Sequence, residues 1–91
     1  MYNDQGDYEK ALEYNGKALA IKGRVLGSEH PDTAQTYNNL ANVYAEQGDY
    51  EKALEYYQRA LKVYLDTFGE EHPGTKKIRD NLTRLQEEMN Q

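Results

Sequence analysis

One segment of this sequence occurs twice, and the distance between its two copies constrains the architecture more than any other feature. The letters QGDYEKALEY fill residues 5–14 and again residues 47–56, which gives a period of about 42 residues. The pattern Gly-x-Glu-His-Pro repeats at the same interval, over 27–31 and 69–73. A repeated unit of this size cannot bury its apolar face alone and must stack on a neighbour. The sequence therefore predicts a short solenoid.

The composition is that of a small, polar, folded domain. The chain has 91 residues, of which 30% are charged and 37% hydrophobic, so it lies near the lower size limit for a single core. Nine tyrosines, one phenylalanine and no tryptophan make up the aromatic residues. Tyrosine buries its ring while its hydroxyl stays near water, which suits thin packing between two layers of helices.

Charge and patterning exclude several classes of partner. The net charge of −5 disfavours binding to nucleic acid or to an anionic membrane surface. Nowhere do 18 apolar residues run together, so no membrane span is expected. There is no cysteine, and the first residues have neither a basic segment nor an apolar run typical of a signal peptide. A cytoplasmic protein is the default expectation.

Four segments carry the periodicity of amphipathic helices. Two are long and begin at an N-capping Asp, Asp7 or Asp49, and each ends before a glycine suited to a helix C-terminus, Gly27 or Gly69. The two shorter segments follow a proline. The four expected helices cover residues 7–26, 33–47, 49–68 and 75–90. Joined by short loops, they predict an all-α chain of about four antiparallel helices.

The spacing of the small and aromatic residues resembles the tetratricopeptide repeat (TPR) family. The family pattern of aromatic, Leu, small and Tyr residues, then Ala, aromatic, Ala and a terminal Pro, matches Tyr37, Leu40, Ala41, Tyr44, Ala53, Tyr57, Ala60 and Pro73. The long unit, with Leu-Gly-x-Glu-His-Pro-x-Thr and Tyr-Asn-Asn-Leu-Ala, is similar to the repeats of kinesin light chains and related bacterial proteins. The resemblance implies an α-α superhelix forming one domain over 1–91. Within it we expect a partial repeat over 1–30, a full repeat over 31–72 and a capping helix over 73–91.

No pattern in the sequence favours an enzyme, a metal site or a cofactor site. His30 and His72 occupy equivalent loop positions about 42 residues apart, as the repeat requires, and no close pair of ligands accompanies them. Ser28 is the only serine, and there is no glycine-rich phosphate loop. The tyrosines fall on core-facing positions, which disfavours a stacking platform for nucleic acid.

The resemblance implies a protein-interaction module whose shorter helices line a concave groove for a peptide or protein segment. The groove positions on those helices are Gln35, Asn38, Asn39, Asn42, Lys77, Asn81 and Arg84. An asparagine amide both donates and accepts, so it can pair with the backbone of a peptide whatever the peptide's side chains. Lys77 and Arg84 add positive charge for an acidic group.

The alternative function is self-association of a structural repeat that has no peptide ligand. The first long helix lacks the shorter helix that would precede it in a full repeat. Its side carrying Tyr8, Ala11, Asn15 and Ala18 is therefore expected to meet protein, most simply the same side of a second copy in a homodimer. Exchange of a helix between two copies or head-to-tail stacking are the other arrangements that the sequence allows.

Overall fold

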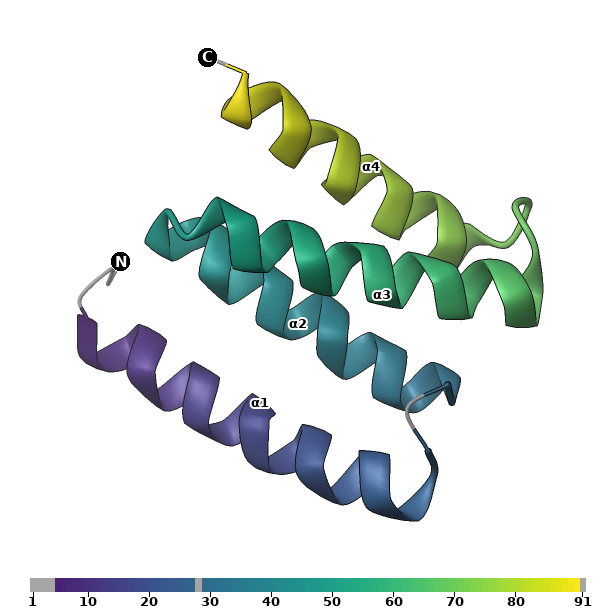
Figure 1. Cartoon of the computed structure of the whole chain (residues 1–91), viewed down its shortest axis with the longest axis horizontal. Coiled ribbons are helices and arrows are strands. Elements are labelled where there is room, and N and C mark those ends of the chain that lie inside the picture. The colour runs from purple at the N-terminus through teal and green to yellow at the C-terminus, as the bar shows by residue number, and fades with distance from the viewer. Residues whose placement is uncertain (1–4, 28, 91) are drawn as a thin grey trace.

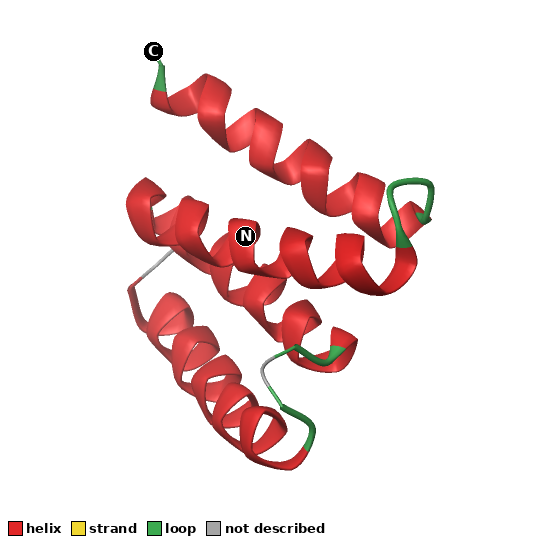
Figure 2. Ribbon diagram, turned by 45° about the vertical axis from the view of Figure 1, so that its right-hand side comes forward, coloured by secondary structure: helices red, strands yellow, loops and turns green. Residues whose placement is uncertain are grey.

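The described part of the chain forms four α-helices, each lying against the next. The computed structural model describes residues 5–27 and 29–90, with side chains from residue 8 onward. The helices are α1 (Gln5–Val25), α2 (Pro31–Gln47), α3 (Tyr50–Phe68) and α4 (Pro73–Met89), and these residues contain no strand. Successive helices run in opposite directions (Figure 1), and the turned view places α1 and α4 at opposite ends of the stack (Figure 2). The predicted all-α solenoid is confirmed, while the outer limits of its units, at 1–4 and 91, lie outside the described residues.

A histidine caps the N-terminus of both short helices. The Nδ1 atom of His30 accepts a hydrogen bond from the backbone N–H of Asp32, and Nδ1 of His72 accepts one from Gly74, both at 3.0 Å. Each proline then occupies the first turn, where its missing N–H costs nothing. Helices α2 and α4 consequently start two residues before the predicted positions. The prediction was late because histidine is not among the preferred N-capping residues.

The N-cap predicted for the second long helix is confirmed. The Oδ1 atom of Asp49 accepts a hydrogen bond from the backbone N–H of Lys52 at 3.4 Å, as expected for α3. The prediction for Asp7 was wrong, because α1 already begins at Gln5 and Asp7 lies inside it. The glycines behind the long helices, Gly27 and Gly69, have φ angles of 95° and 85°, which favour glycine strongly.

The core lies between α2, α3 and α4. One cluster contains Ala34, Tyr37, Ala60, Val63 and Ile78, and a second contains Ala41, Ala53, Tyr57 and Leu85. Alanines at the helix contacts let the backbones approach closely, and tyrosines fill the space beside them. Leu19 of α1 reaches the first cluster only as a partly buried side chain, and none of the described α1 residues is fully buried.

In each short helix, one buried threonine forms a hydrogen bond with the end of the long helix before it. Thr33 and Thr75 are fully buried and occupy equivalent positions in the two repeats. The hydroxyl of Thr33 donates to the carbonyl of Gly27 at 2.8 Å, and that of Thr75 donates to the carbonyl of Tyr64 at 3.4 Å. Each of these carbonyls also accepts a backbone hydrogen bond, Gly27 from His30 and Tyr64 from Gly69, so the threonine hydroxyls add a second donor that fixes each short helix against the end of the preceding one.

Candidate functional site

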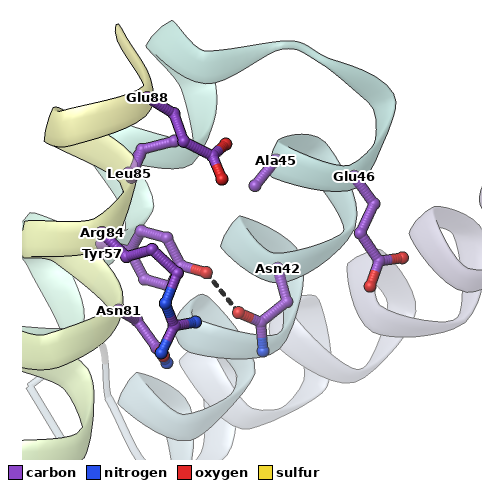
Figure 3. A pocket seen from close by; sticks show the side chains of 8 residues that line it. All are labelled: Asn42, Ala45, Glu46, Tyr57, Asn81, Arg84, Leu85 and Glu88. Carbon is purple, nitrogen blue, oxygen red and sulfur yellow. Dashed lines mark hydrogen bonds between the residues drawn. The ribbon is translucent and has the colours of Figure 1, made fainter. Parts of the chain in front are cut away.

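A groove runs between α2 and α4, over a floor that α3 supplies. Its larger cavity has a volume of about 380 Å³, and its lining residues are Asn42, Ala45, Glu46, Tyr57, Asn81, Arg84, Leu85 and Glu88 (Figure 3). A second cavity of about 250 Å³ continues it toward the start of α4, lined by Gln35, Asn38, Asn39, Asn42, Tyr64, Gly74, Lys77 and Ile78. The two cavities share Asn42 and therefore form one continuous polar surface.

Every groove residue predicted from the sequence lines one of these two cavities. Gln35, Asn38, Asn39 and Lys77 belong to the smaller cavity, Asn81 and Arg84 to the larger one, and Asn42 to both. Contact of these residues with a ligand stays a prediction. These polar residues share one surface because they lie opposite the apolar stripes of α2 and α4.

An amide pair bridges the two helices. The Nδ2 atom of Asn81 on α4 donates to Oδ1 of Asn38 on α2, at 3.5 Å. Both side chains are half-buried, and this bond is long for a hydrogen bond between amides. Each amide still has capacity left for further hydrogen bonds, so the pair can offer donors and acceptors to a third group in the groove.

Asn42 is held by the floor of the groove. The hydroxyl of Tyr57, on α3, donates to Oδ1 of Asn42 (Figure 3). Tyr57 is only 4% exposed, so this bond satisfies a hydroxyl that water hardly reaches. The Nδ2 atom of Asn42 takes part in none of the side-chain hydrogen bonds found among residues 8–27 and 29–90. Sequence analysis assigned Tyr57 to the core and missed this link, because the spacing of residues shows which side chains are buried but not what their polar ends contact.

The larger cavity carries charges of both signs. Arg84 and Lys77 take no part in the ion pairs found among residues 8–27 and 29–90, although Glu46 and Glu88 line the cavity that contains Arg84. Burial raises the pKa of the Tyr57 hydroxyl, the Arg84 guanidinium lowers it, and the carboxylates of Glu46 and Glu88 raise it. These three charges therefore act on the same point in the groove. An incoming acidic group would meet a cation that has no fixed partner, flanked by carboxylates that limit how much negative charge the cavity accepts.

The residues predicted for self-association lie along the side of α1 that faces α2. Tyr8, Ala11, Asn15 and Ala18 are half-buried, on the same side of the helix as Leu19. Asn15 donates its Nδ2 hydrogen to the carbonyl of Ala11 at 2.9 Å. Ala53 and Ala60 of α3, the equivalents of Ala11 and Ala18, are fully buried, so this side of α1 is less covered than the same side of α3. Contact between two copies through this side stays a prediction.

Two other kinds of site find no support in the described part of the chain. Among residues 5–27 and 29–90 no three His, Asp or Glu side chains are grouped closely enough to hold a metal ion. In the same residues no helix has the length and apolar character needed to cross a bilayer.

Comparison with known proteins assigns the family. The family model described as tetratricopeptide repeat matches residues 1–66 and 37–91, which together cover the chain. The chain is also similar to the human clustered mitochondria protein homolog, with 50% identity over 36 residues. That match covers 40% of this chain and only 3% of the relative's length, so it concerns a small part of a much larger protein. With the helix order and the core spacing described above, the two family matches show that the chain belongs to the tetratricopeptide repeat family.

Proposed function

We propose that this chain is a non-enzymatic protein-interaction module that binds an extended segment of a partner protein in the groove between α2 and α4. The observation that carries the proposal is the continuity of the two cavities, which meet at Asn42. Repeats of this family are generally protein-interaction modules, and the groove is the surface where this chain gathers polar side chains from two different helices. We also propose the long type of repeat, similar to that of kinesin light chains, and a cytoplasmic location.

The amides account for binding that depends little on the ligand's sequence. Asn38, Asn42 and Asn81 lie along the groove, and each has at least one donor beyond the hydrogen bonds described above. A peptide backbone exposes N–H and C=O groups along its length, and asparagine amides match both. The walls thus hold an extended chain by its backbone.

Specificity comes from the two ends of the groove. Ala45 and Leu85 give the larger cavity an apolar wall of limited size, suited to a small apolar side chain. Lys77 and Arg84 stand about two helical turns apart on α4 and attract acidic groups at both cavities. A ligand that alternates small apolar and acidic residues fits this arrangement.

The test uses peptides selected from a phage-displayed random library on the whole chain. The affinity of the selected peptides is then measured by fluorescence polarisation against the double variant Asn38→Ala/Asn81→Ala. This variant removes both members of one amide pair, so neither is left unpaired and the fold is retained. The matched control is Gln58→Ala, which removes an exposed amide from α3.

The expected result is a loss of affinity of about tenfold or more for the double variant and none for the control. An unchanged melting temperature in both variants shows that folding is intact. The groove is excluded as the binding surface if the selected peptides bind the double variant as tightly as the parent chain. Failure to select any peptide from the library counts equally against the proposal.

A further inference from the structure

A row of apolar side chains on α1 is open to solvent. Tyr14, Ile21 and Val25 are 74%, 63% and 72% exposed, and they lie on one side of the helix, with about two turns between Tyr14 and Ile21 and about one turn between Ile21 and Val25. We name these three residues the α1 stripe. Isolated exposed apolar residues are ordinary, but three on one side of a single helix form an apolar surface of the kind that protein contacts cover.

A row of cations follows one border of this stripe. Lys10, Lys17 and Arg24 are exposed and recur at intervals of seven residues, so they lie on one side of α1. We name them the basic row. Lys17 forms an ion pair of 3.4 Å with Glu13, and both side chains are largely exposed, so water screens this pair and it contributes little to stability. The row therefore adds positive charge beside the stripe.

The internal repeat shows what covers an aromatic ring at the position of Tyr14. Its equivalent, about 42 residues later, is Tyr56 of α3. The ring of Tyr56 stacks against two rings of α2, those of Tyr37 and Tyr44, with centroid distances of 5.9 and 5.8 Å. Two aromatic residues of α2, seven positions apart, thus cover the ring of Tyr56, which is the equivalent of Tyr14.

A second position of the stripe repeats the same relation. Ile21 corresponds to Val63, which is 3% exposed and packs in one cluster with Ala34 of α2. Ile21 and Val63 are both β-branched and differ by one methylene, so the same small residue fits against either. Tyr14 and Ile21 of the α1 stripe therefore stand at positions that α2 covers on α3, whereas the equivalent of Val25 is the exposed Thr67.

The basic row also has a counterpart with known contacts. Lys10 corresponds to Lys52, whose Nζ lies 5.4 Å from the centre of the Tyr44 ring. Lys17 corresponds to Arg59, whose guanidinium lies 5.8 Å from the centre of the Tyr37 ring. These are cation–π distances, so the cations of α3 lie beside the aromatic residues of the covering helix.

We propose that the α1 stripe docks an acidic amphipathic helix of a partner protein, one that carries two aromatic residues seven positions apart with small residues between them. Its rings stack on Tyr14 from either side and lie beneath Lys10 and Lys17, and its small residues pack on Ile21. Acidic residues along its border pair with the basic row. This surface is separate from the α2/α4 groove, so the inference does not rest on the peptide-binding proposal.

A second copy of this chain fits the surface poorly. In an antiparallel pair of α1 helices, related by a twofold axis perpendicular to them, identical borders meet. The two basic rows would then meet along one side of the contact, which brings six cations together, of which only the Lys17 of each copy has an acidic partner, Glu13. Charge thus favours a different, acidic helix over self-pairing.

Head-to-tail stacking of copies fits no better. It would place α4 of one copy on α1 of the next, in the role that α2 has on α3. The positions of α4 equivalent to Ala34, Tyr37, Ala41 and Tyr44 are Lys76, Arg79, Thr83 and Gln86. Neither aromatic ring is present, and two further cations would approach the basic row.

The chain itself supplies a probe with the required chemistry. A peptide of residues 31–47 carries Tyr37, Ala41 and Tyr44 together with two acidic residues, Asp32 and Glu46. A short free helix is marginal in water, so the peptide is stapled between positions 35 and 39, which are exposed and lie opposite the tyrosines. Labelled with a fluorophore, it is titrated with the whole chain and with the variant Tyr14→Ala/Ile21→Ala. Glu9→Ala, on the opposite side of α1, is the control variant.

Binding is expected for the parent chain and for the Glu9 variant, with an affinity at least about tenfold lower for Tyr14→Ala/Ile21→Ala. A matched peptide with Tyr37→Ala and Tyr44→Ala, and a peptide of residues 73–89, should not bind. Amide chemical shifts of the labelled chain should move at α1. Circular dichroism of each variant shows that loss of binding is not loss of folding.

Three results would overturn the proposal. The first is the same affinity for the parent chain and the Tyr14/Ile21 variant, which would mean that the peptide displaces the chain's own α2. The second is that the parent chain does not bind the stapled peptide. The third is a dimer at micromolar concentration in sedimentation that Tyr14→Ala converts to a monomer, since a second copy would then be the occupant.

Discussion

At the scale of single residues, the contact between Tyr57 and Asn42 ties the core to the groove. The ring of Tyr57 packs in the core cluster of Ala41, Ala53 and Leu85, while its hydroxyl donates to the groove residue Asn42. Asn42 therefore both stabilises the fold and lines the proposed binding surface. A loss of binding in an Asn42 variant could come from either role, which is why the groove test uses Asn38 and Asn81.

A double-mutant cycle separates these roles. Asn42→Ala leaves the buried Tyr57 hydroxyl without its partner and is expected to lower the free energy of unfolding by about 1–3 kcal/mol. Tyr57→Phe removes the hydroxyl as well, so Asn42→Ala made in the Tyr57→Phe background should cost much less. Urea denaturation of the four proteins measures the difference.

The control for this cycle is Asn39→Ala. Asn39 is exposed, on the same helix and in the same groove, so its replacement gives the same gain in helix propensity without removing a buried partner. It should change the free energy of unfolding by less than about 0.5 kcal/mol. Equal effects of the Asn39 and Asn42 changes would show that the hydrogen bond to Tyr57 contributes nothing to stability.

At the scale of the helices, the sequence predicted the number, order and character of the elements. It did not predict all of their first residues, because these depend on the capping contacts. Periodic Ala, Leu and Tyr positions predicted the first three helices, and Ile78, Leu82, Leu85 and Met89 predicted α4, because burial selects apolar residues at the same spacing wherever a helix packs. The starts of α2 and α4 were missed, since Nδ1 of His30 and His72 acts as a cap only when the loop turns the ring back onto the helix. The amide pair between Asn38 and Asn81 was likewise beyond prediction, because it depends on the distance between two helices that are not adjacent in the chain.

Two glycines make α1 the weakest helix, and their replacement should strengthen it. Gly16 and Gly23 lie inside α1 with ordinary helical φ angles, and a Cβ added to either meets nothing within 4 Å. Gly16→Ala and Gly23→Ala should each raise the free energy of unfolding by about 0.5–1 kcal/mol, because alanine loses less backbone entropy on folding. Thermal and urea denaturation measure the gain.

Gly48→Ala is the matched control for those changes. A Cβ at Gly48 also meets nothing within 4 Å, but its φ angle is 89°, a conformation that alanine adopts only with strain. This variant should be destabilised, by about 1 kcal/mol or more. A stabilised Gly48→Ala protein, or destabilised α1 variants, would contradict the assignment of the cost to backbone conformation.

At the scale of the whole molecule, cover is distributed unevenly along the stack. Helix α3 lies between α2 and α4 and contributes four fully buried side chains, Ala53, Tyr57, Ala60 and Val63. Helix α1 packs mainly against α2 and contributes none among its described residues. In a solenoid each unit contacts only its neighbours, so the local stability of a helix depends on how many neighbouring helices pack against it.

This unevenness predicts that α1 opens before the rest of the molecule. Amide hydrogens in the middle of α1 should exchange with solvent through local opening, at a free energy below that of global unfolding, while those of α3 should exchange only through global unfolding. Native-state hydrogen exchange with increasing denaturant distinguishes the two. The double variant Gly16→Ala/Gly23→Ala should raise the protection of α1 amides selectively. The stapled 31–47 peptide should have the same effect if it binds the α1 stripe, because a ligand stabilises the form to which it binds. Equal protection of α1 and α3 in the unliganded chain would mean that the four helices form one cooperative unit, and that the open face of α1 costs the molecule no local stability.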